Sequence, residues 1–209
     1  MRPRLLDLFC GAGGAAMGYH QAGFEVVGVD IKKQPRFPFE FHQADALEFP
    51  LDGFDVYHAS PPCQAYSRAF SALVGYRKDH PDLVGSTRNL LIGVGKPFII
   101  ENVIGSPLFN YIELDGTMFG LKTYKCRWFE LHGFGIPELP LSRYKKGMVK
   151  SGELVGIISH SDNPQERTRR EDMEGAYGID WGLNRHELRQ AIPPAYTEYI
   201  GKYLLRALR

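Results

Sequence analysis

The sequence predicts an α/β protein built on an open sheet. Its first apolar run, Leu5 to Phe9, is followed by a glycine-rich turn and a helical stretch that ends near Gln21. This order of strand, turn and helix is how dinucleotide-type folds begin. Another apolar run, over 54–59, indicates a buried strand that two prolines then end. Near the C-terminus, apolar residues recur at helical spacing from Tyr196 to Ala207, so we expect one face of a final helix to pack on the sheet.

Composition limits the class of protein. A chain of 209 residues is expected to form one domain and can bury a substantial core. No apolar run is long enough to cross a bilayer, and residues 1–4 lead directly into a core strand rather than forming a secretory signal. We therefore expect a cytoplasmic protein with no membrane partner. The net charge is +1, but a local basic face is enough to bind nucleic acid.

Cysteine and histidine usage predicts neither disulfides nor a metal site. The three cysteines, Cys10, Cys63 and Cys126, are odd in number and irregularly spaced, which favours a reducing compartment. No pair of them has the spacing of zinc ligands, and the seven histidines are scattered along the chain. We accordingly expect no bound metal.

Cys63 is the candidate nucleophile. It lies in Ser60-Pro61-Pro62-Cys63-Gln64, directly after the buried strand, where each proline fixes its own φ and restricts the residue before it. Open α/β sheets bind ligands just beyond the ends of their strands. A thiol on a stiff turn at that place is well positioned to attack a substrate. The alternative is an ordinary half-buried thiol beside a structural turn.

Acids at the ends of strands predict an adenosine-like ligand. The second strand, Glu25 to Asp30, ends in an acid at the distance where dinucleotide-type folds bind a ribose hydroxyl. Asp45 ends the next short segment, and we expect it to bind the adenine amino group. The glycine turn lacks the third glycine of the dinucleotide pattern, since Gly14 follows Gly13 at once, so a pyrophosphate is not implied. The alternative for Asp30 is a helix or turn cap.

The middle of the chain combines a polar stretch with a further strand. After Cys63, irregular sequence extends to about residue 86, and it carries Gln64, Ser67, Arg68, Arg77, Lys78, His80 and, just beyond, Arg88. A loop of this kind could close over a polyanionic substrate, and a solvated surface loop is the alternative. A helix over 86–94 and a buried strand over 96–100 are expected next, with Glu101 at the end of that strand.

The C-terminal part contains cations that need partners. Residues 114–131 predict one or two strands, and Arg127 in the second of them requires a ligand or a salt bridge to a strand-end carboxylate. Two basic clusters, one around Tyr144 and one over 167–170, could bind phosphates or simply form solvated faces. Between them, 153–159 is expected to be a strand. Pro193 and Pro194 indicate the first turn of the final helix.

Three segments, taken in order, resemble the DNA cytosine-5 methyltransferases. They are Asp7-Leu8-Phe9-Cys10-Gly11-Ala12-Gly13-Gly14, then Ser60-Pro61-Pro62-Cys63-Gln64, then Glu101-Asn102-Val103. The resemblance covers roughly residues 4–131 and the C-terminal helix. It implies a three-layer, Rossmann-like S-adenosylmethionine-dependent methyltransferase sheet with a small target-recognition appendage. The corresponding division is a core over 1–131, a reduced recognition region over 132–188 and a returning helix over 189–209.

The resemblance also implies roles for matching residues. Cys63, Glu101 and Arg127 would be catalytic: Cys63 faces the target base, Glu101 binds ring nitrogen 3 and the amino group, and Arg127 contacts the base carbonyl. S-adenosylmethionine would be bound by Phe9, Gly11, Gly13, Gly14, Asp30, Ile31, Asp45, Ala46, Pro61 and Gln190. A cytosine flipped out of double-stranded DNA would be bound by Pro62, Gln64, Ser67, Asn102 and Lys125.

The chemistry of cytosine supports these roles. Carbon 5 is a poor nucleophile, and addition of a thiolate at carbon 6 makes it enamine-like. Glu101 at ring nitrogen 3 would stabilise the charge that builds there. A cytosine in a duplex must be flipped out to reach the thiolate.

The sequence departs from the family pattern in three places. The Gln-x-Arg-x-Arg motif reads Thr123-x-Lys125-x-Arg127, and the Gly-Asn before the C-terminal prolines is Arg189-Gln190. The region over 132–188 is short, whereas specific DNA interfaces bury roughly 1,000–2,500 Å² of protein. We therefore expect a short or relaxed target sequence, or a second chain that supplies recognition surface. Such a compact enzyme would suit a bacteriophage or a restriction-modification system.

Three other functions remain open from the sequence. The chain could be a tRNA cytosine-5 methyltransferase of the DNA-enzyme type, which uses the same chemistry. It could be a non-catalytic module that binds DNA or regulates a partner, although the intact Cys63 and Glu101 favour an enzyme. Modification of free cytosine nucleotides is a fourth hypothesis, which the basic clusters disfavour.

Overall fold

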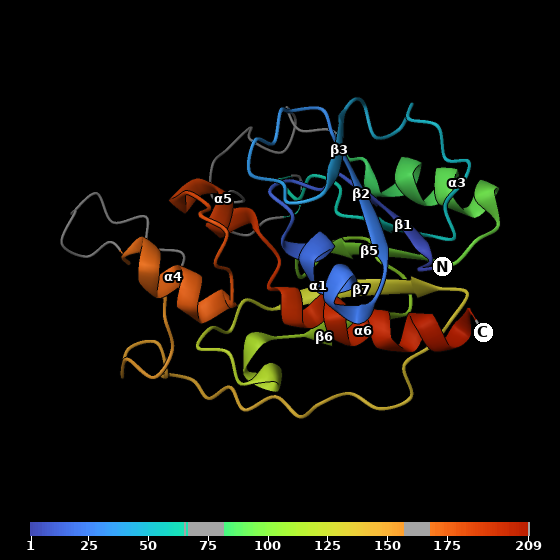
Figure 1. Cartoon of the computed structure of the whole chain (residues 1–209). Coiled ribbons are helices and arrows are strands. Elements are labelled where there is room, and N and C mark those ends of the chain that lie inside the picture. The colour runs from blue at the N-terminus through green and yellow to red at the C-terminus, as the bar shows by residue number, and fades with distance from the viewer. Residues whose placement is uncertain (65, 67–81, 157–167, 209) are drawn as a thin grey trace.

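The computed structural model describes residues 1–64, 66, 82–156 and 168–208. In this part of the chain, a seven-stranded sheet runs in the order β3-β2-β1-β4-β5-β7-β6 (Figure 1). The strands are β1 (Arg4–Leu8), β2 (Glu25–Asp30), β3 (Glu40–Gln43), β4 (Val56–Ala59), β5 (Phe98–Asn102), β6 (Tyr111–Leu114) and β7 (Arg127–His132). The helices are α1 (Gly14–Ala22), α3 (Val84–Val94), α4 (Arg170–Tyr177), α5 (Arg185–Gln190) and α6 (Pro194–Ala207), with a short 3-10 helix η2 (Gly116–Phe119).

The sheet is parallel over its first five strands. Neighbouring pairs among β1 to β5 run in the same direction, and β7 is antiparallel to both β5 and β6. The chain therefore starts in the middle of the sheet at β1, builds β2 and β3 to one side, and then returns to build β4 and β5 on the other. The carboxyl ends of β1 and β4 meet at this reversal, which is where open α/β sheets bind ligands. The predicted α/β fold is confirmed.

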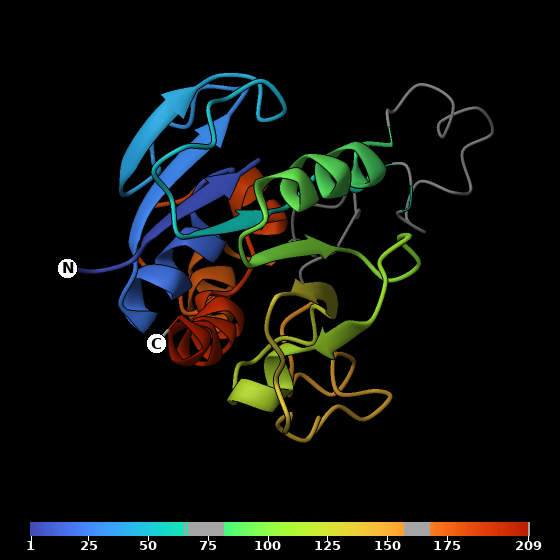
Figure 2. The same cartoon turned by 90° about the vertical axis from the view of Figure 1, so that its right-hand side faces the viewer.

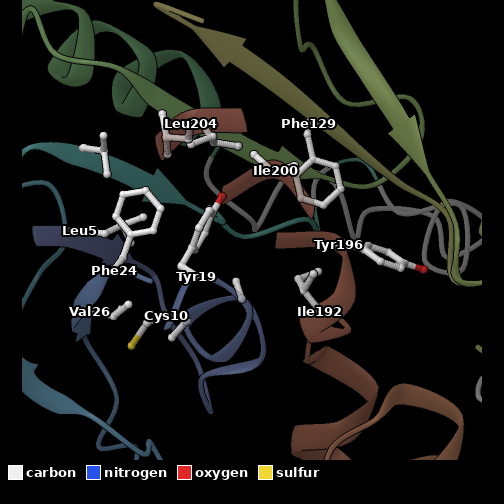
Figure 3. Packing of buried hydrophobic residues seen from close by; sticks show 14 of the residues in the cluster. Leu5, Cys10, Tyr19, Phe24, Val26, Phe129, Ile192, Tyr196, Ile200 and Leu204 are labelled. Carbon is white, nitrogen blue, oxygen red and sulfur yellow. The ribbon is translucent and has the colours of Figure 1, made fainter. Parts of the chain in front are cut away.

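Helices cover both faces of the sheet (Figures 1 and 2). On one face, α1 and α6 bury an apolar layer against the strands, and Figure 3 shows Tyr19 and Tyr196 inside it. On the other face, α3 covers a second layer that includes Leu91, Phe98 and Ile100. The two layers follow from strand alternation, because successive residues of a strand point to opposite faces. The central strands β1, β4 and β5 are thus buried on both sides, as in other parallel sheets.

Close contact between α1 and α6 depends on a missing side chain. A Cβ atom added to Gly18 would lie 2.1 Å from the carbonyl oxygen of Pro194 and 2.1 Å from the hydroxyl of Thr197. The hydroxyl of Thr197 donates to the carbonyl of Ala15 at 2.8 Å, which joins the two helices. As the sequence predicts, Pro194 is in the first turn of α6, and Tyr196, Ile200 and Leu204 are buried. Ala207, at the end of the predicted apolar stripe, is exposed.

Several expectations for the second half of the chain were wrong. The described part of the predicted strand 153–159, residues 153–156, is not a strand, and its backbone makes loop contacts such as Val155 N–H to Lys122 C=O at 2.7 Å. Arg88 lies in α3 rather than in a loop, and its guanidinium forms an ion pair with Glu130 at 2.7 Å. The short helices α4 and α5 were not predicted. Arg68, Arg77, Lys78 and His80 lie outside the described residues.

Two further findings concern the described residues only. None of their helices is both long and apolar enough to span a membrane. They contain no group of three or more histidine, cysteine, aspartate or glutamate side chains arranged to hold a metal ion.

Candidate active site

The turn that carries Cys63 is held from both neighbouring strands. Ser60 continues the pairing beyond β4, since its N–H donates to the carbonyl of Leu8 at 3.1 Å. The side-chain amide of Asn102, at the end of β5, donates to the carbonyl of Pro61 at 2.9 Å. Cys63 is half-buried and has no disulfide. The thiol is therefore positioned on a turn that is fixed at the carboxyl end of β4.

Glu101 and Arg127 form an ion pair beside this turn. The Nε of Arg127 lies 3.0 Å from Oε1 of Glu101, and the two side chains are 19% and 7% exposed. Register explains the pair, because Glu101 on β5 lies opposite Phe129 on the antiparallel β7, two residues from Arg127. The alternative that the sequence left open, a salt bridge to a strand-end carboxylate, is what the structure shows. The pair also keeps a buried carboxyl group and a cation at the same strand ends as Cys63.

Burial dominates the titration of this carboxyl group. Burial raises the pKa of Glu101 above its ordinary value, while the charge of Arg127, a hydrogen bond from Ser60 and the charge of Lys125 oppose the rise. A glutamate with a raised pKa can hold a proton closer to neutral pH than an exposed one, as general acids require.

The thiol is less acidic than a free cysteine. Burial, followed by the charge of Glu101, raises the pKa of Cys63, and the charges of Arg127 and Lys125 act in the opposite direction. Lys125 lies against the ring of Tyr177 at 4.6 Å and donates to the carbonyl of Arg189 at 2.8 Å. Burial lowers the pKa of Lys125 well below its ordinary value. The nucleophile therefore rests as a thiol between an acid and two basic side chains.

The glycine turn after β1 lies at the same end of the sheet. Phe9 takes a left-handed conformation with φ of 57°, and Gly11 and Gly13 have φ of 49° and 89°. The N–H of Gly11 donates to Oδ2 of Asp30 at 3.0 Å. A Cβ at Gly14 would lie 2.3 Å from the carbonyl oxygen of Ile192, so the segment before α6 packs directly on the turn. This contact agrees with the predicted return of the C-terminal element to the glycine turn.

The two predicted adenosine-binding acids differ in how many hydrogen bonds their carboxylate oxygens already accept. Asp30 accepts from Gly11 N–H through one oxygen and from Lys32 N–H at 2.8 Å through the other. The turn-cap alternative for Asp30 thus describes its local contacts. Asp45 is exposed, and its Oδ1 accepts from Leu47 N–H at 2.9 Å. Each carboxylate oxygen can accept a second hydrogen bond, so both acids retain capacity for a ligand.

The remaining predicted residues lie in different environments. Ile31 is 64% exposed, whereas Ala46 and Pro61 are buried. Pro62 and Gln64 are half-buried on the Cys63 turn, and Gln190 is exposed at the end of α5. The side-chain oxygen of Gln64 is buried and has no hydrogen-bond partner among the described residues. Ser67 lies outside those residues.

Three buried polar residues near the site were missed. Asp7 is fully buried in β1, and neither of its carboxyl oxygens has a hydrogen-bond partner within the described ranges. Burial raises the pKa of Asp7 well above its ordinary value. His58 on β4 and Tyr19 on α1 are also fully buried and bond to each other at 2.9 Å. The signal that could have found Asp7 and His58 is the one used for Arg127, a polar residue inside an apolar strand.

Solved structures with a similar fold include methyltransferases. The fold matches that of a protein described as a DNA modification methyltransferase encoded within a prophage of E. coli, with a TM-score of 0.67, 15% identity and 99% of each chain covered. It also matches S. pombe Dnmt2 methyltransferase, with a TM-score of 0.65, 15% identity and 100% of each chain covered. An Entamoeba histolytica methyltransferase, EhMeth, gives a TM-score of 0.60 at 13% identity, covering 100% of this chain and 98% of that one. The fold is therefore of the Rossmann-like methyltransferase class.

The sequence itself also matches a family model. The model of the C-5 cytosine-specific DNA methylases matches residues 3–105, which include the glycine turn, the Cys63 turn and Glu101. No curated protein sequence matches the chain. The N-terminal half of the chain is thus similar to the C-5 cytosine-specific DNA methylases, enzymes that use S-adenosylmethionine as methyl donor.

Proposed function

We propose that this protein methylates carbon 5 of cytosine in DNA through a covalent bond between Cys63 and carbon 6. The observation that carries this proposal is the arrangement at the carboxyl ends of β4 and β5 and the amino end of the antiparallel β7. There a free thiol on a fixed turn lies beside the buried Glu101–Arg127 pair. The family match supports the same chemistry.

Each step assigns a task to a residue of this chain. The thiol of Cys63 gives its proton to water, and the sulfur bonds to carbon 6 as the carbon 5–carbon 6 double bond shifts to carbon 4–carbon 5 and ring nitrogen 3 takes a proton from Glu101. Arg127 fixes the orientation of the carboxyl group of Glu101 and would contact the base carbonyl. Carbon 5 is then electron-rich and is methylated. Water takes the proton of carbon 5, the carbon 5–carbon 6 double bond forms as the carbon 6–sulfur bond breaks, and ring nitrogen 3 returns its proton to Glu101, which restores the ring and frees Cys63 as a thiolate.

The residues around the glycine turn fit S-adenosylmethionine. When bound, it supplies the electrophilic methyl group. The positive φ of Gly11 and the open space where its side chain would be let a ligand approach the backbone. Asp30 would bind the ribose and Asp45 the adenine amino group, and we place Phe9, Gly13, Gly14, Ile31, Ala46, Pro61 and Gln190 around them.

A basic segment over 143–150 suits the phosphates of DNA. Arg143, Lys145, Lys146 and Lys150 are exposed, and no ion pair within the described residues involves them. Tyr144 is 38% exposed and stacks on Tyr124 at 4.0 Å between ring centroids. By contrast, Arg169 and Arg170 pair with acids of their own helix, and Arg167 lies outside the described residues. We propose that the basic segment, within the region 132–188, contacts the DNA backbone.

The small size of region 132–188 supports a short or relaxed target sequence, or a second chain that completes the interface. The division into a core, this region and a C-terminal helix stays a proposal, since α5 runs across the boundary at 188. We propose that Pro62, Gln64 and Lys125 contact the flipped cytosine. Asn102 is buried, and both polar atoms of its side chain bond to backbone. We therefore assign Asn102 to positioning the turn rather than to contact with the base.

The test measures transfer of tritiated methyl groups to an unmethylated genomic duplex, followed by bisulfite sequencing of the product. Wild type should give 5-methylcytosine, and Cys63→Ala and Glu101→Gln should lower transfer by several orders of magnitude. Cys126→Ala removes a free thiol whose side chain is not assigned to the site, so it should transfer at the wild-type rate. Equal transfer by Cys63→Ala would refute the proposed nucleophile. Transfer to tRNA but not to DNA would refute the proposed substrate.

A further inference from the structure

A chain of hydrogen bonds crosses the apolar layer beneath the site. The hydroxyl of Tyr19 lies 2.9 Å from Nδ1 of His58, and Nε2 of His58 lies 2.9 Å from the hydroxyl of Ser60. Ser60 in turn lowers the pKa of the Glu101 carboxyl group through a side-chain hydrogen bond. Tyr19 projects from α1 among apolar side chains that include Phe24 and Ile200 (Figure 3). This chain of hydrogen bonds thus links α1 in the core to Glu101, the predicted proton donor of the reaction.

The direction of each bond follows from the protonation of its members. Burial raises the pKa of Tyr19 well above its ordinary value, so its hydroxyl keeps its hydrogen. In the described part of the chain the only partner of that hydroxyl is Nδ1 of His58, so the hydroxyl donates and Nδ1 accepts. Burial lowers the pKa of His58 to about 3, so the ring is neutral. Its single hydrogen must then be on Nε2, which donates to Ser60.

The hydroxyl hydrogen of Ser60 is the last one in this chain of hydrogen bonds whose position must be assigned. Because the Ser60 oxygen accepts from His58, its own hydrogen is free to point to the carboxyl group of Glu101. A chain of this kind has one polarity from end to end, since a reversed Ser60 would leave a buried donor or acceptor unpaired. We propose that His58 is a positioning residue that acts through Ser60 and fixes the Ser60 hydroxyl as a donor to Glu101. This inference rests on the proposed function of Glu101 as the group that serves ring nitrogen 3.

The consequence for catalysis concerns which oxygen of Glu101 faces the base. Arg127 occupies Oε1 at 3.0 Å, and a second fixed donor limits rotation of the carboxyl group. Four other groups interact electrostatically with Glu101. They are Lys125 in the segment before β7, Cys63 on its turn, Asp7 on β1 and Tyr19 on α1. His58 itself has Asp7 as its neighbour in the sheet register, and burial raises the pKa of that carboxyl group well above its ordinary value. Ser60 is thus the contact through which His58 can influence the acid.

The test compares the pH profiles of kcat/KM for wild type, Ser60→Ala, Ser60→Thr and Tyr19→Phe. The acid limb is the part of the profile in which kcat/KM falls as the pH is lowered. It reports the group with the lower pKa, which is Glu101 rather than Cys63. A donor to a carboxylate stabilises its charged form and lowers its pKa. Ser60→Ala should therefore raise the pKa of Glu101 and move the acid limb upward by about one pH unit. Ser60→Thr keeps the hydroxyl and should restore the wild-type limb, and Tyr19→Phe should move it part of the way.

The double variant Tyr19→Phe/Ser60→Ala decides whether the chain acts through Ser60. It should give the profile of Ser60→Ala alone, whereas added shifts would overturn the proposal. The control is Thr197→Val, which removes another buried hydrogen bond of α1, that to Ala15. It should lower thermal stability and leave the limb in place. A wild-type limb in Ser60→Ala would also refute the proposal. Full activity in Glu101→Gln would instead refute the proposed function on which it rests.

Discussion

At the scale of the residue, the site depends on how firmly the Cys63 turn is attached to β5. Asn102 makes this attachment, donating to Pro61 C=O at 2.9 Å and accepting from Val103 N–H at 2.9 Å. Glu101 is the residue directly before it, so the same strand end holds the acid and the turn of the nucleophile. A displacement of about 1 Å between reacting groups can reduce a rate by two orders of magnitude.

We predict that Asn102→Ala lowers kcat by ten- to a hundredfold and destabilises the fold by about 1–3 kcal/mol, because a buried carbonyl is left without its donor. Steady-state kinetics and urea unfolding measure the two effects. Ser106→Ala is the matched control, since Ser106 is also buried and donates to Val103 C=O at 2.8 Å without touching the turn. It should be destabilised and keep its activity. An equal decrease of kcat in both variants would mean that the effect is not specific to the turn.

At the scale of the element, the fit of α1 against α6 fixes the glycine turn. α1 begins at Gly14, directly after that turn, and the start of α6 packs on it at Gly18. Thr197 adds a hydrogen bond between the helices. Displacing α6 would therefore displace the backbone that is expected to border the cofactor.

We predict that Gly18→Ala destabilises the protein by about 1–3 kcal/mol, because the added methyl group meets backbone that cannot move without shifting the helix. Gly93→Ala is the control: Gly93 lies in α3 with nothing within 4 Å of an added Cβ. It should stabilise the fold by about 0.5–1 kcal/mol through helix propensity. Urea unfolding of the two variants measures both changes, and wild-type stability in Gly18→Ala would contradict the packing described here.

Elements with strong local patterns could be predicted from the sequence. β2 has the bounds that its apolar run indicated, Glu25–Asp30, and α6 begins at the expected prolines. α4 and α5 were missed because they are short and because polar residues dominate them. Each still had a signal: Met173, Ala176 and Tyr177 are buried at helical spacing in α4. Asn184 and Glu187 form the capping box of α5.

In the candidate site, too, some features could be predicted from local sequence and others could not. Motif residues such as Cys63 and Glu101 could be found because their types and spacing are specific. The pairing of Glu101 with Arg127 depends on antiparallel register between β5 and β7, and no local pattern fixes that register. The chain from Tyr19 through His58 to Ser60 joins a helix to a strand 39 residues later. Such contacts need the three-dimensional fold.

At the scale of the whole molecule, the proposed DNA-binding function depends on charge distribution rather than total charge. The net charge is +1, and the exposed cations of the basic segment 143–150 are concentrated in one stretch. Exposed cations without ion pairs can exchange their counterions for phosphates, which makes affinity depend on salt.

We predict that the triple variant Lys145→Gln/Lys146→Gln/Lys150→Gln weakens binding to duplex DNA at every sequence. Its plot of log Kd against log salt should be shallower by about 0.9 for each phosphate that the variant no longer neutralises. Arg169→Gln/Arg170→Gln removes two cations that already pair with acids, so it should change the slope little. Fluorescence anisotropy with a labelled duplex gives both slopes. An unchanged slope in the triple variant would exclude the basic segment from the interface.

The central claim is that Cys63 bonds to the target base. The most direct measurement incubates the protein and S-adenosylmethionine with duplex DNA containing 5-fluorocytosine, whose carbon 5 carries no proton to lose. Elimination of the cysteine is then blocked. Wild type should form a protein–DNA complex that survives a denaturing gel, and peptide mapping should place the bond at Cys63. Methyl transfer to ordinary duplexes by wild type without any such complex, or an equal yield of complex from Cys63→Ser, would contradict the account.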